Sequence, residues 1–325
     1  MSFCSSLEQR CRARASGPAM SLRSAAITTS LLCLACSGAP AAEVAPAPTL
    51  PAPVPAADAE PTPAPLTVEH RPELAERIAA TGYQGTFAVL VGDRLIVSDP
   101  ALAEQGMIPA STFKIPNSLI SLELGVIDGP ETTLAWDGVE RWLPAWNRDH
   151  DLRSAFANSV VWYYQELARR VGRARMQEWL TAIDYGNATI GDGPVDGFWL
   201  NGPLRISARE QVEFLRRLHA GETPFSPATV EAFLGEVMIV DPKYGLRAKT
   251  GWADSSDFAD PASAGFVGNL GWYVGSVEPA PGGERVFYAT WLIAPEPAPE
   301  SFSEDRKTVS LELLCAVGHG PAGRC

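Results

Sequence analysis

The chain carries Ala110-Ser111-Thr112-Phe113-Lys114-Ile115-Pro116-Asn117 and, much later, Lys249-Thr250-Gly251. In the first stretch a serine precedes a lysine by three positions, a spacing that brings both side chains to one face of a helical turn. Pro116 is compatible with a helix only close to its start, so the stretch predicts a helix that begins near Ser111. The amine of Lys114 would then reach the hydroxyl of Ser111.

The use of lysine in both motifs is informative, because the chain has only four lysines among its 26 basic residues. A guanidinium stays protonated at any accessible pH, whereas a buried amine sheds its proton and can act as a base or a nucleophile. Taken alone, the first motif also fits a helix-capping serine and a solvated lysine. Taken together, Lys114 and Lys249 indicate a serine acyl-transfer enzyme.

Length and composition describe an ordinary globular protein. The 325 residues suit one large domain or two small ones, and 46% hydrophobic with 20% charged residues is enough to bury a core. A net charge of −12 argues against nucleic acid and anionic membrane surfaces as partners. The four histidines are scattered without zinc-ligand spacing, so no metal site is predicted.

The N-terminus has the pattern of a targeting segment. Residues 1–36 are predicted to be a signal segment, with Met20 as an alternative true start. The apolar stretch 25–35 is too short to span a bilayer. Processing at Cys36, which would then be lipidated, and ordinary cleavage after residues 39–41 are both compatible with the sequence. Either predicts an exported, periplasmic protein, and the first alternative adds a lipid anchor at Cys36 as its only membrane contact.

A linker separates this segment from the folded part of the chain. Residues 37–65 are dominated by Ala and Pro and lack the bulky apolar residues that a core requires, so they predict a semi-extended linker. The domain is predicted to occupy residues 66–325. It contains Cys315 and Cys325, which in an oxidising compartment are compatible with a disulfide or with free thiols.

Periodicity within the domain changes from strands to helices and back to strands. Helical patterns fill residues 110–235, and strands precede and follow them. This order predicts an α+β fold, in which both ends of the chain complete an antiparallel sheet flanked by N- and C-terminal helices and an all-helical subdomain is inserted. The elements expected outside the helical part are a helix between Pro72 and Gly82, a hairpin over 86–97, strands at Lys249, 271–277 and 285–293, and a final helix over 303–317.

With its other motifs in order, the chain resembles the class D (oxacillinase-type) serine β-lactamases of the β-lactamase and penicillin-binding transpeptidase superfamily. The resemblance covers about residues 70–320, and its middle motif is Ser-x-Val where class A enzymes have Ser-Asp-Asn. It rests on residues 110–117, Trp136-Asp137-Gly138, Ser159-Val160-Val161, Tyr185-Gly186-Asn187, Phe198-Trp199-Leu200, Leu204-Arg205-Ile206-Ser207, Lys249-Thr250-Gly251 and Trp272-Tyr273-Val274-Gly275.

The resemblance implies a role for each central residue. Ser111 is the nucleophile that opens the lactam ring. Lys114 is carbamylated by CO2 to N6-carboxylysine, the only cofactor chemistry implied, and acts as general base for acylation and deacylation. Trp199 donates its indole N–H to the carbamate. Ser159 relays a proton to the departing lactam nitrogen, and Lys249 supplies positive potential beside it.

The resemblance also implies how substrate is held. The backbone N–H groups of Ser111 and Trp252 would form the oxyanion hole. Arg306 would bind the substrate carboxylate, for which a guanidinium fork is suited. The other implied substrate-binding residues are Val161, Tyr185, Leu200, Thr250 and Gly251, although the Tyr-Gly-Asn motif also fits a structural turn bordering the site.

The function expected is hydrolysis of β-lactam antibiotics, and hence resistance to them. The alternative is a penicillin-binding or β-lactam-sensing domain that is acylated without turnover, although sensor domains of this ancestry follow several membrane spans. The segment 252–270 is longer and more acidic than the family pattern leads us to expect. Because it would lie beside the mouth of the site, we expect it to influence which acyl side chains are accepted. No pattern favours a particular oligomeric state.

Overall fold

The structure is a computed structural model that describes residues 65–279 and 283–325. The predicted signal segment, the lipidation site at Cys36 and nearly all of the predicted linker lie outside the described residues. The described part is the region in which the catalytic domain was expected.

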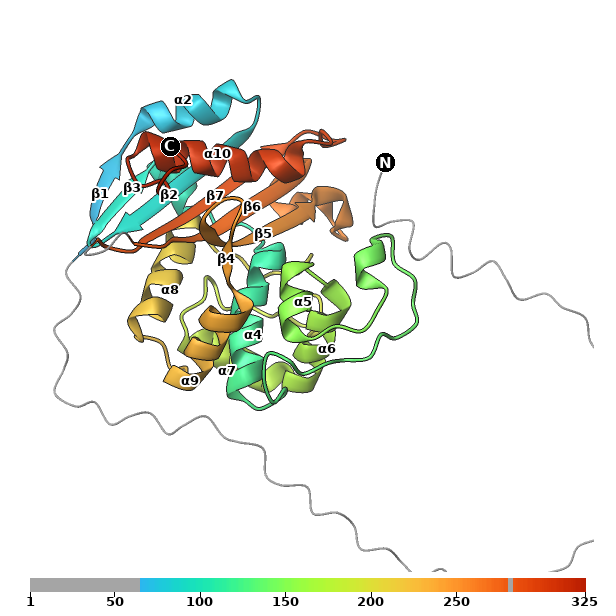
Figure 1. Cartoon of the computed structure of the whole chain (residues 1–325). Helices are drawn as coiled ribbons and strands as arrows, with labels where there is room; N and C mark the ends of the chain where they lie inside the picture. Colours follow the sequence, from blue (N-terminus) through green and yellow to red (C-terminus); the bar gives the residue numbers. More distant parts are fainter. Residues whose placement is uncertain (1–64, 280–282) are drawn as a thin grey trace, which may run out of the picture. The chain divides into compact units, whose positions relative to one another are not determined.

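A seven-stranded sheet forms the centre of the domain, in the order β1-β3-β2-β7-β6-β5-β4 (Figure 1). Neighbouring strands are antiparallel except for β1 and β3, which are parallel. Strand β2, from the start of the domain, pairs with β7, from its end, so both ends of the chain contribute to the middle of the sheet. The strands are β1 (Thr67–His70), β2 (Gln84–Val91), β3 (Arg94–Val97), β4 (Val240–Asp241), β5 (Leu246–Asp254), β6 (Asn269–Val277) and β7 (Val286–Ala294).

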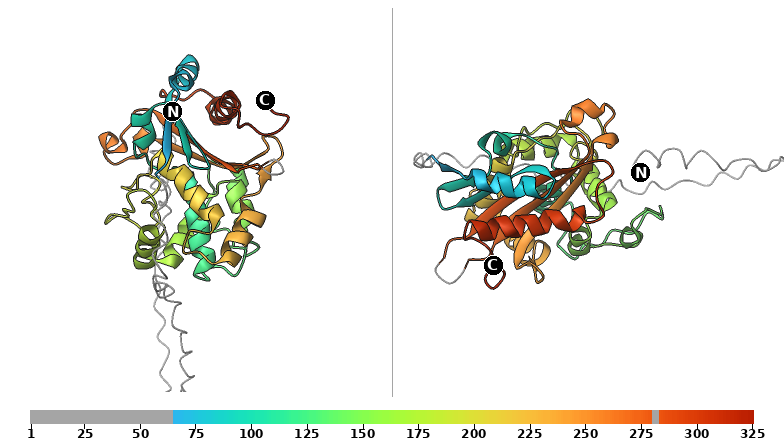
Figure 2. Two further views of the ribbon diagram at one scale, coloured as in Figure 1. Left: turned by 90° about the vertical axis from the view of Figure 1, so that its left-hand side faces the viewer. Right: turned by 90° about the horizontal axis from the view of Figure 1, so that it is seen from above.

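Helices cover both faces of this sheet. Helices α2 and α10 lie on one face, and the helical part from α4 to α9 lies on the other (Figures 1 and 2). The helices are α2 (Pro72–Ala80), α3 (Pro100–Glu104), α4 (Lys114–Glu123), α5 (Leu152–Ala157), α6 (Val161–Val171), α7 (Arg173–Ala182), α8 (Ala208–Ala220), α9 (Pro227–Ala232) and α10 (Phe302–Ala316). Short helical turns are η2 (Ala110–Phe113), η3 (Pro144–Trp146), η4 (Phe233–Val237), η5 (Ser255–Asp257) and η6 (Pro261–Ala264).

The predicted α+β fold is confirmed, including the inserted helical part and the flanking terminal helices. Because helices cover both faces, every residue of β6 is buried, as a strand with two covered faces should be. The core between the sheet and helices α2 and α10 includes Leu74, Phe87, Leu292, Phe302 and Leu313.

Local signals explain where the elements begin and end. Pro72 starts α2, and Gly82 follows the helix with φ +83°. Ser207 and Glu210 form a capping box at the start of α8, and Gly221 ends that helix in the left-handed conformation. The predicted position of the helix between Pro72 and Gly82 is confirmed.

Candidate active site

The Ser111 and Lys114 side chains meet because the chain enters α4 through a 3₁₀ turn. In a 3₁₀ turn residues three apart are nearly eclipsed, so the side chain of Lys114 lies over that of Ser111. The Lys114 Nζ donates a hydrogen bond to the Ser111 Oγ at 2.9 Å. Ala110, immediately before the serine, has φ +49°, a strained value for a non-glycine residue. Pro116 falls in the first turn of α4, where its missing N–H costs no hydrogen bond.

The amine of Lys114 is removed from water. Its side chain is fully buried, and its Nζ lies 5.2 Å from the centre of the Tyr164 ring. Phe113, which lies between Ser111 and Lys114 in the sequence, stacks its ring on that of Trp199, with the ring centres 5.1 Å apart. Burial lowers the pKa of Lys114 to about 7, because an ammonium ion is poorly solvated there. A large neutral fraction of the amine is therefore present at neutral pH.

The second pair joins the helical part to the sheet. Lys249 in β5 donates to the Ser159 Oγ at 3.0 Å and to the carbonyl of Thr250 at 3.2 Å. Ser159 lies between α5 and α6 and has φ +55°, again in the left-handed region. A strained backbone conformation is retained where the surrounding structure holds the chain in place. Here the strained conformation accompanies the hydrogen bond between Ser159 and the amine of Lys249.

The surroundings of Lys249 disfavour its protonated form. Burial lowers its pKa well below the usual value, and the cations of Lys114 and Arg306 lower it further. The positive potential expected at Lys249 stays a prediction.

Two close contacts join the residues just before Ser111 to strands β5 and β6. Trp272 in β6 donates its indole N–H to the carbonyl of Ile108 at 2.9 Å. At Gly251, a Cβ atom would lie 3.0 Å from the carbonyl oxygen of Pro109 and 3.1 Å from the Trp272 Cβ. Glycine in the Lys-Thr-Gly motif thus allows β5 to pack against the chain just before Ser111.

Arg306 lies behind β5 on helix α10. Its Nη1 donates to the carbonyl of Gly251 at 2.5 Å, and its guanidinium lies 5.3 Å from the ring of Trp252. The side chain is largely buried, and burial lowers its pKa to about 10. Its role in binding a carboxylate, like the oxyanion role of the Trp252 backbone, stays a prediction. Of the other expected substrate contacts, Val161, Leu200 and Thr250 are partly exposed.

Tyr185 occupies a different place from the one expected. Its side chain is fully buried and packs against Phe113 and Phe214. A substrate cannot touch a side chain in that position, so its predicted binding role is not supported, and packing explains it. The neighbouring Asn187 accepts from the backbone N–H of Arg205 and donates to the carbonyl of Pro203. The Tyr-Gly-Asn motif therefore supports the segment of residues 197–205, which we call the Trp199 segment.

Tyr164 is a site residue that the sequence interpretation missed. Its ring faces the Lys114 amine, and its hydroxyl forms a 2.8 Å hydrogen bond with Ser118, whose hydroxyl also donates to the Lys114 carbonyl. The available signal was helical spacing, since Tyr164 follows Val161 of the Ser-x-Val motif by three residues on α6.

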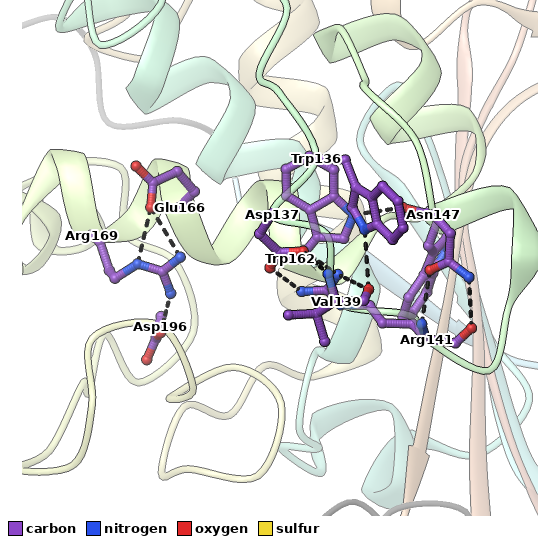
Figure 3. A network of polar contacts seen from close by, with 10 residues as sticks. Trp136, Asp137, Val139, Arg141, Asn147, Trp162, Glu166, Arg169 and Asp196 are labelled. Carbon is purple, nitrogen blue, oxygen red and sulfur yellow. Dashed lines mark hydrogen bonds and ion pairs between the residues drawn. The ribbon is translucent and has the colours of Figure 1, made fainter. Parts of the chain in front are cut away.

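A hydrogen-bonded loop that includes Trp136, Arg141 and Asn147 precedes α5 (Figure 3). Arg141 binds both carboxylate oxygens of Asp137, at 2.8 and 2.6 Å, and exchanges two hydrogen bonds with Asn147. Trp146 donates to the carbonyl of Asn158 at 2.9 Å, next to Ser159. The Trp136-Asp137-Gly138 motif thus begins a loop whose far end supports the residue before Ser159.

A surface hollow of about 370 Å³ lies beside this loop, and its lining contains neither Ser111 nor Lys114. Its arginines have carboxylate partners: Arg141 binds Asp137, and Arg169 and Arg170 both bind Glu166 (Figure 3). Because these charges are compensated, we assign no ligand to the hollow.

No cluster of His, Cys, Asp and Glu within residues 65–279 and 283–325 could hold a metal ion. Within the same ranges, no helix is both long and apolar enough to cross a membrane.

Comparison with known proteins gives consistent results. Residues 98–294 match the family described as the penicillin binding protein transpeptidase domain. The chain is 46% identical over 178 residues to β-lactamase OXA-48 of Klebsiella pneumoniae, spanning 54% of this chain and 63% of that relative. It is 39% identical over 223 residues to β-lactamase OXA-5 of Pseudomonas aeruginosa, spanning 68% of this chain and 78% of the relative.

Solved structures extend the similarity to the fold. The class D β-lactamase YbXI from Nostoc is 38% identical, has a TM-score of 0.67, and is matched over 75% of this chain and 98% of its own. FUS-1 (OXA-85), a class D β-lactamase from Fusobacterium nucleatum subsp. polymorphum, is 32% identical with a TM-score of 0.68, over 77% and 99% respectively. The chain thus spans less than two thirds of OXA-48 but nearly the whole of both solved structures.

Proposed function

Since the chain belongs to the class D β-lactamases, within the penicillin-binding transpeptidase family, we propose that it hydrolyses β-lactam antibiotics through an acyl-enzyme on Ser111. Resistance to those antibiotics would follow. The observation that carries the proposal is the 2.9 Å hydrogen bond between Ser111 and a fully buried amine. Such a pair is the arrangement that activates a serine hydroxyl for attack on a carbonyl carbon.

In acylation, the Ser111 Oγ attacks the lactam carbonyl and loses its proton toward Lys114. The C–N bond of the ring then breaks, and the departing nitrogen needs a proton. Ser159 is suited to deliver it, because its hydroxyl is already hydrogen-bonded to Lys249. The backbone N–H groups of Ser111 and Trp252 would stabilise the negative charge on the carbonyl oxygen.

We further propose that Lys114 is carbamylated by CO2. The residues present fit this modification, because the reaction needs a neutral amine and burial lowers the Lys114 pKa to about 7. The nearby rings of Tyr164, Phe113 and Trp199 provide apolar surroundings. The carbamate would supply a general base for Ser111 and for the deacylating water.

Carbamylation would also explain a charged Lys249. In the unmodified protein the Lys114 cation lowers the Lys249 pKa. Replacing that cation by an anion reverses the sign of the interaction, which raises the Lys249 pKa relative to that in the unmodified protein. The positive potential expected beside Ser159 therefore depends on the state of Lys114.

The test is to incubate the purified domain with a penicillin and to follow its mass with time. We expect an adduct on Ser111 that forms and then clears, and loss of chromogenic cephalosporin hydrolysis in Ser111→Ala. Ser303→Ala, which changes an exposed serine of α10, is the control and should hydrolyse normally. A persistent adduct would instead identify a penicillin-binding or sensing domain, and turnover by Ser111→Ala would exclude the serine mechanism.

We also propose that the protein is exported. The N-terminal pattern described above supports this, as does the disulfide between Cys315 and Cys325, because such bonds persist in oxidising compartments. Labelled palmitate should be incorporated into the full chain and not into Cys36→Ser if the lipid-anchored alternative is correct. An unlabelled, freely periplasmic wild-type protein would favour cleavage after residues 39–41, and a cytoplasmic protein would contradict export.

A further inference from the structure

The long acidic segment between β5 and β6 folds into a compact unit, which we call the β5–β6 flap (residues 255–268). Its base is closed by hydrogen bonds from the Ser255 N–H to the Gly268 carbonyl at 2.9 Å and from the Gly268 N–H to the Ser255 hydroxyl at 3.0 Å. Phe258 and Phe266 are buried within it, with perpendicular rings 6.1 Å apart. A small apolar core therefore stabilises the flap.

Arg205 connects the flap to the Trp199 segment. Its Nη1 donates to the carbonyls of Gly202 and Leu204, at 2.7 and 2.9 Å, within the segment itself. Its Nη2 donates to the carbonyl of Ser263 in the flap at 2.7 Å, and the guanidinium lies 5.8 Å from the ring of Phe258. One planar side chain thus joins two parts of the chain that are more than fifty residues apart.

Two further contacts hold the same segment. Asn201 donates its side-chain N–H to the carbonyl of Asp257 in the flap at 3.1 Å. On the opposite side, Asn187 binds the backbone of Arg205 and of Pro203. The Trp199 segment is therefore fixed both by the flap and by the Tyr-Gly-Asn motif.

The segment held in this way packs against the Ser111–Lys114 motif. The rings of Phe198 and Trp199 lie 5.0 and 5.1 Å from the ring of Phe113, which lies between Ser111 and Lys114 in sequence. If this packing were lost, we expect water to reach the Lys114 amine, which is fully buried. The protonated amine would then be better solvated, and less neutral amine would be present to take up CO2.

We propose that Arg205 is a positioning residue which, with the β5–β6 flap, clasps the Trp199 segment against Phe113 and thereby retains the CO2-derived modification on Lys114. This proposal rests on the proposed function, because it concerns the same modification. It also assigns the long flap a role inside the protein, in addition to any effect on the acyl side chain of the substrate.

The chemistry of arginine suits this role. A guanidinium presents several donors in one plane, which matches three carbonyls lying in different directions. Burial lowers the pKa of Arg205, so the side chain occupies this place at a desolvation cost that its hydrogen bonds must offset. A lysine ammonium would keep the charge without the fixed planar geometry.

The experiment compares wild type, Arg205→Ala and Arg205→Lys for the bicarbonate concentration that gives half-maximal cephalosporin hydrolysis. We expect Arg205→Ala to need about tenfold more, since each unit by which the Lys114 pKa rises reduces the neutral amine tenfold. Saturating bicarbonate should restore most of the wild-type kcat, and Arg205→Lys should be intermediate. The carbamate signal in ¹³C NMR should fall in parallel at low bicarbonate.

Arg209→Ala is the matched control, because Arg209 forms surface ion pairs with Glu104 and Glu213 and should keep the wild-type requirement. If Arg205→Ala does not fold, Asn201→Ala tests the second contact and should shift the requirement in the same direction. If the Arg205 or Asn201 variant gives the same carbamate signal as wild type and needs the same bicarbonate concentration, the clasp alone is overturned. A wild-type protein with no carbamate signal overturns both the clasp and the proposed carbamylation.

Discussion

At the scale of single residues, the properties of Lys114 follow from the absence of water around its amine. Its pKa falls to about 7 because the ammonium form loses hydration on burial, and no other cause is needed. The sequence motif identified the lysine, but a pKa depends on every group that surrounds it. Those groups come from α4, α6 and the Trp199 segment, which only the fold brings together.

We expect activity to fall on the acid side of about pH 7. Below the Lys114 pKa the amine is protonated and cannot take up CO2, so kcat/KM at limiting bicarbonate should drop about tenfold per pH unit. A pH–rate profile at low and at saturating bicarbonate checks this, and the acid limb should move to lower pH as bicarbonate rises. A flat profile down to pH 5 at low bicarbonate would contradict the assignment.

Replacing each catalytic lysine by arginine should separate their roles. Lys114→Arg should lose about 10³-fold or more in kcat, because a guanidinium cannot give up its proton to accept CO2. Lys249→Arg keeps a positive charge beside Ser159 and should lose less, about ten- to a hundredfold. Steady-state kinetics on both variants measure the difference. Equal losses would show that Lys249 also acts through its neutral form.

At the scale of elements, local sequence signals predicted the helices and strands well, and contacts between elements decided the details. The capping box of α8 and the proline at the start of α2 are readable from neighbouring residues alone. The 3₁₀ turn before α4 and the left-handed conformation of Ser159 are not, because they accompany contacts between elements far apart in the sequence. The burial of Tyr185 likewise depends on its packing against Phe113 and Phe214.

Gly186 offers a test of how the Tyr-Gly-Asn turn supports the Trp199 segment. A Cβ at this position would lie 2.0 Å from the carbonyl oxygen of Arg205, so Gly186→Ala must displace that backbone. The control is Gly125→Ala, which has a similar φ of +60° and no neighbour within 4 Å. We expect the control to cost about 1 kcal/mol of unfolding free energy and Gly186→Ala at least about 2 kcal/mol more.

Urea unfolding measures both costs. Gly186→Ala should in addition raise the bicarbonate requirement, because it moves the backbone of Arg205. Equal losses of unfolding free energy in Gly186→Ala and Gly125→Ala would mean that the turn adapts to the added Cβ without strain.

At the scale of the whole molecule, the catalytic groups come from both sides of a discontinuous fold. Ser111 and Lys114 belong to the helical part, whereas Lys249 lies on a strand of the sheet that the chain completes only after leaving that part. The site therefore requires the complete domain. The fold also settles one alternative left open by the sequence, because Cys315 and Cys325 form a disulfide.

This disulfide should matter little to catalysis. It joins Cys315, in the last turn of α10, to Cys325 ten residues later, next to Arg324, which donates to the carbonyl of Pro242. We expect Cys325→Ser to lower stability by about 2 kcal/mol, which is roughly 4–8 °C in Tm for a domain of this size, with kcat unchanged. Thermal unfolding with and without a reducing agent checks this, since the reductant should affect wild type and not the variant.

The sequence alone determined the family, the α+β order of elements and the identity of Ser111, Lys114, Ser159 and Lys249. These follow from motifs and periodicities, which are patterns formed by residues close together in the sequence. The tertiary structure decided the environment of those groups: the dry pocket of Lys114, the lowered pKa of Lys249, the packing role of Tyr185 and the Arg205 clasp. Desolvation, charge coupling and steric contact act through space, and they join residues that the linear order keeps far apart.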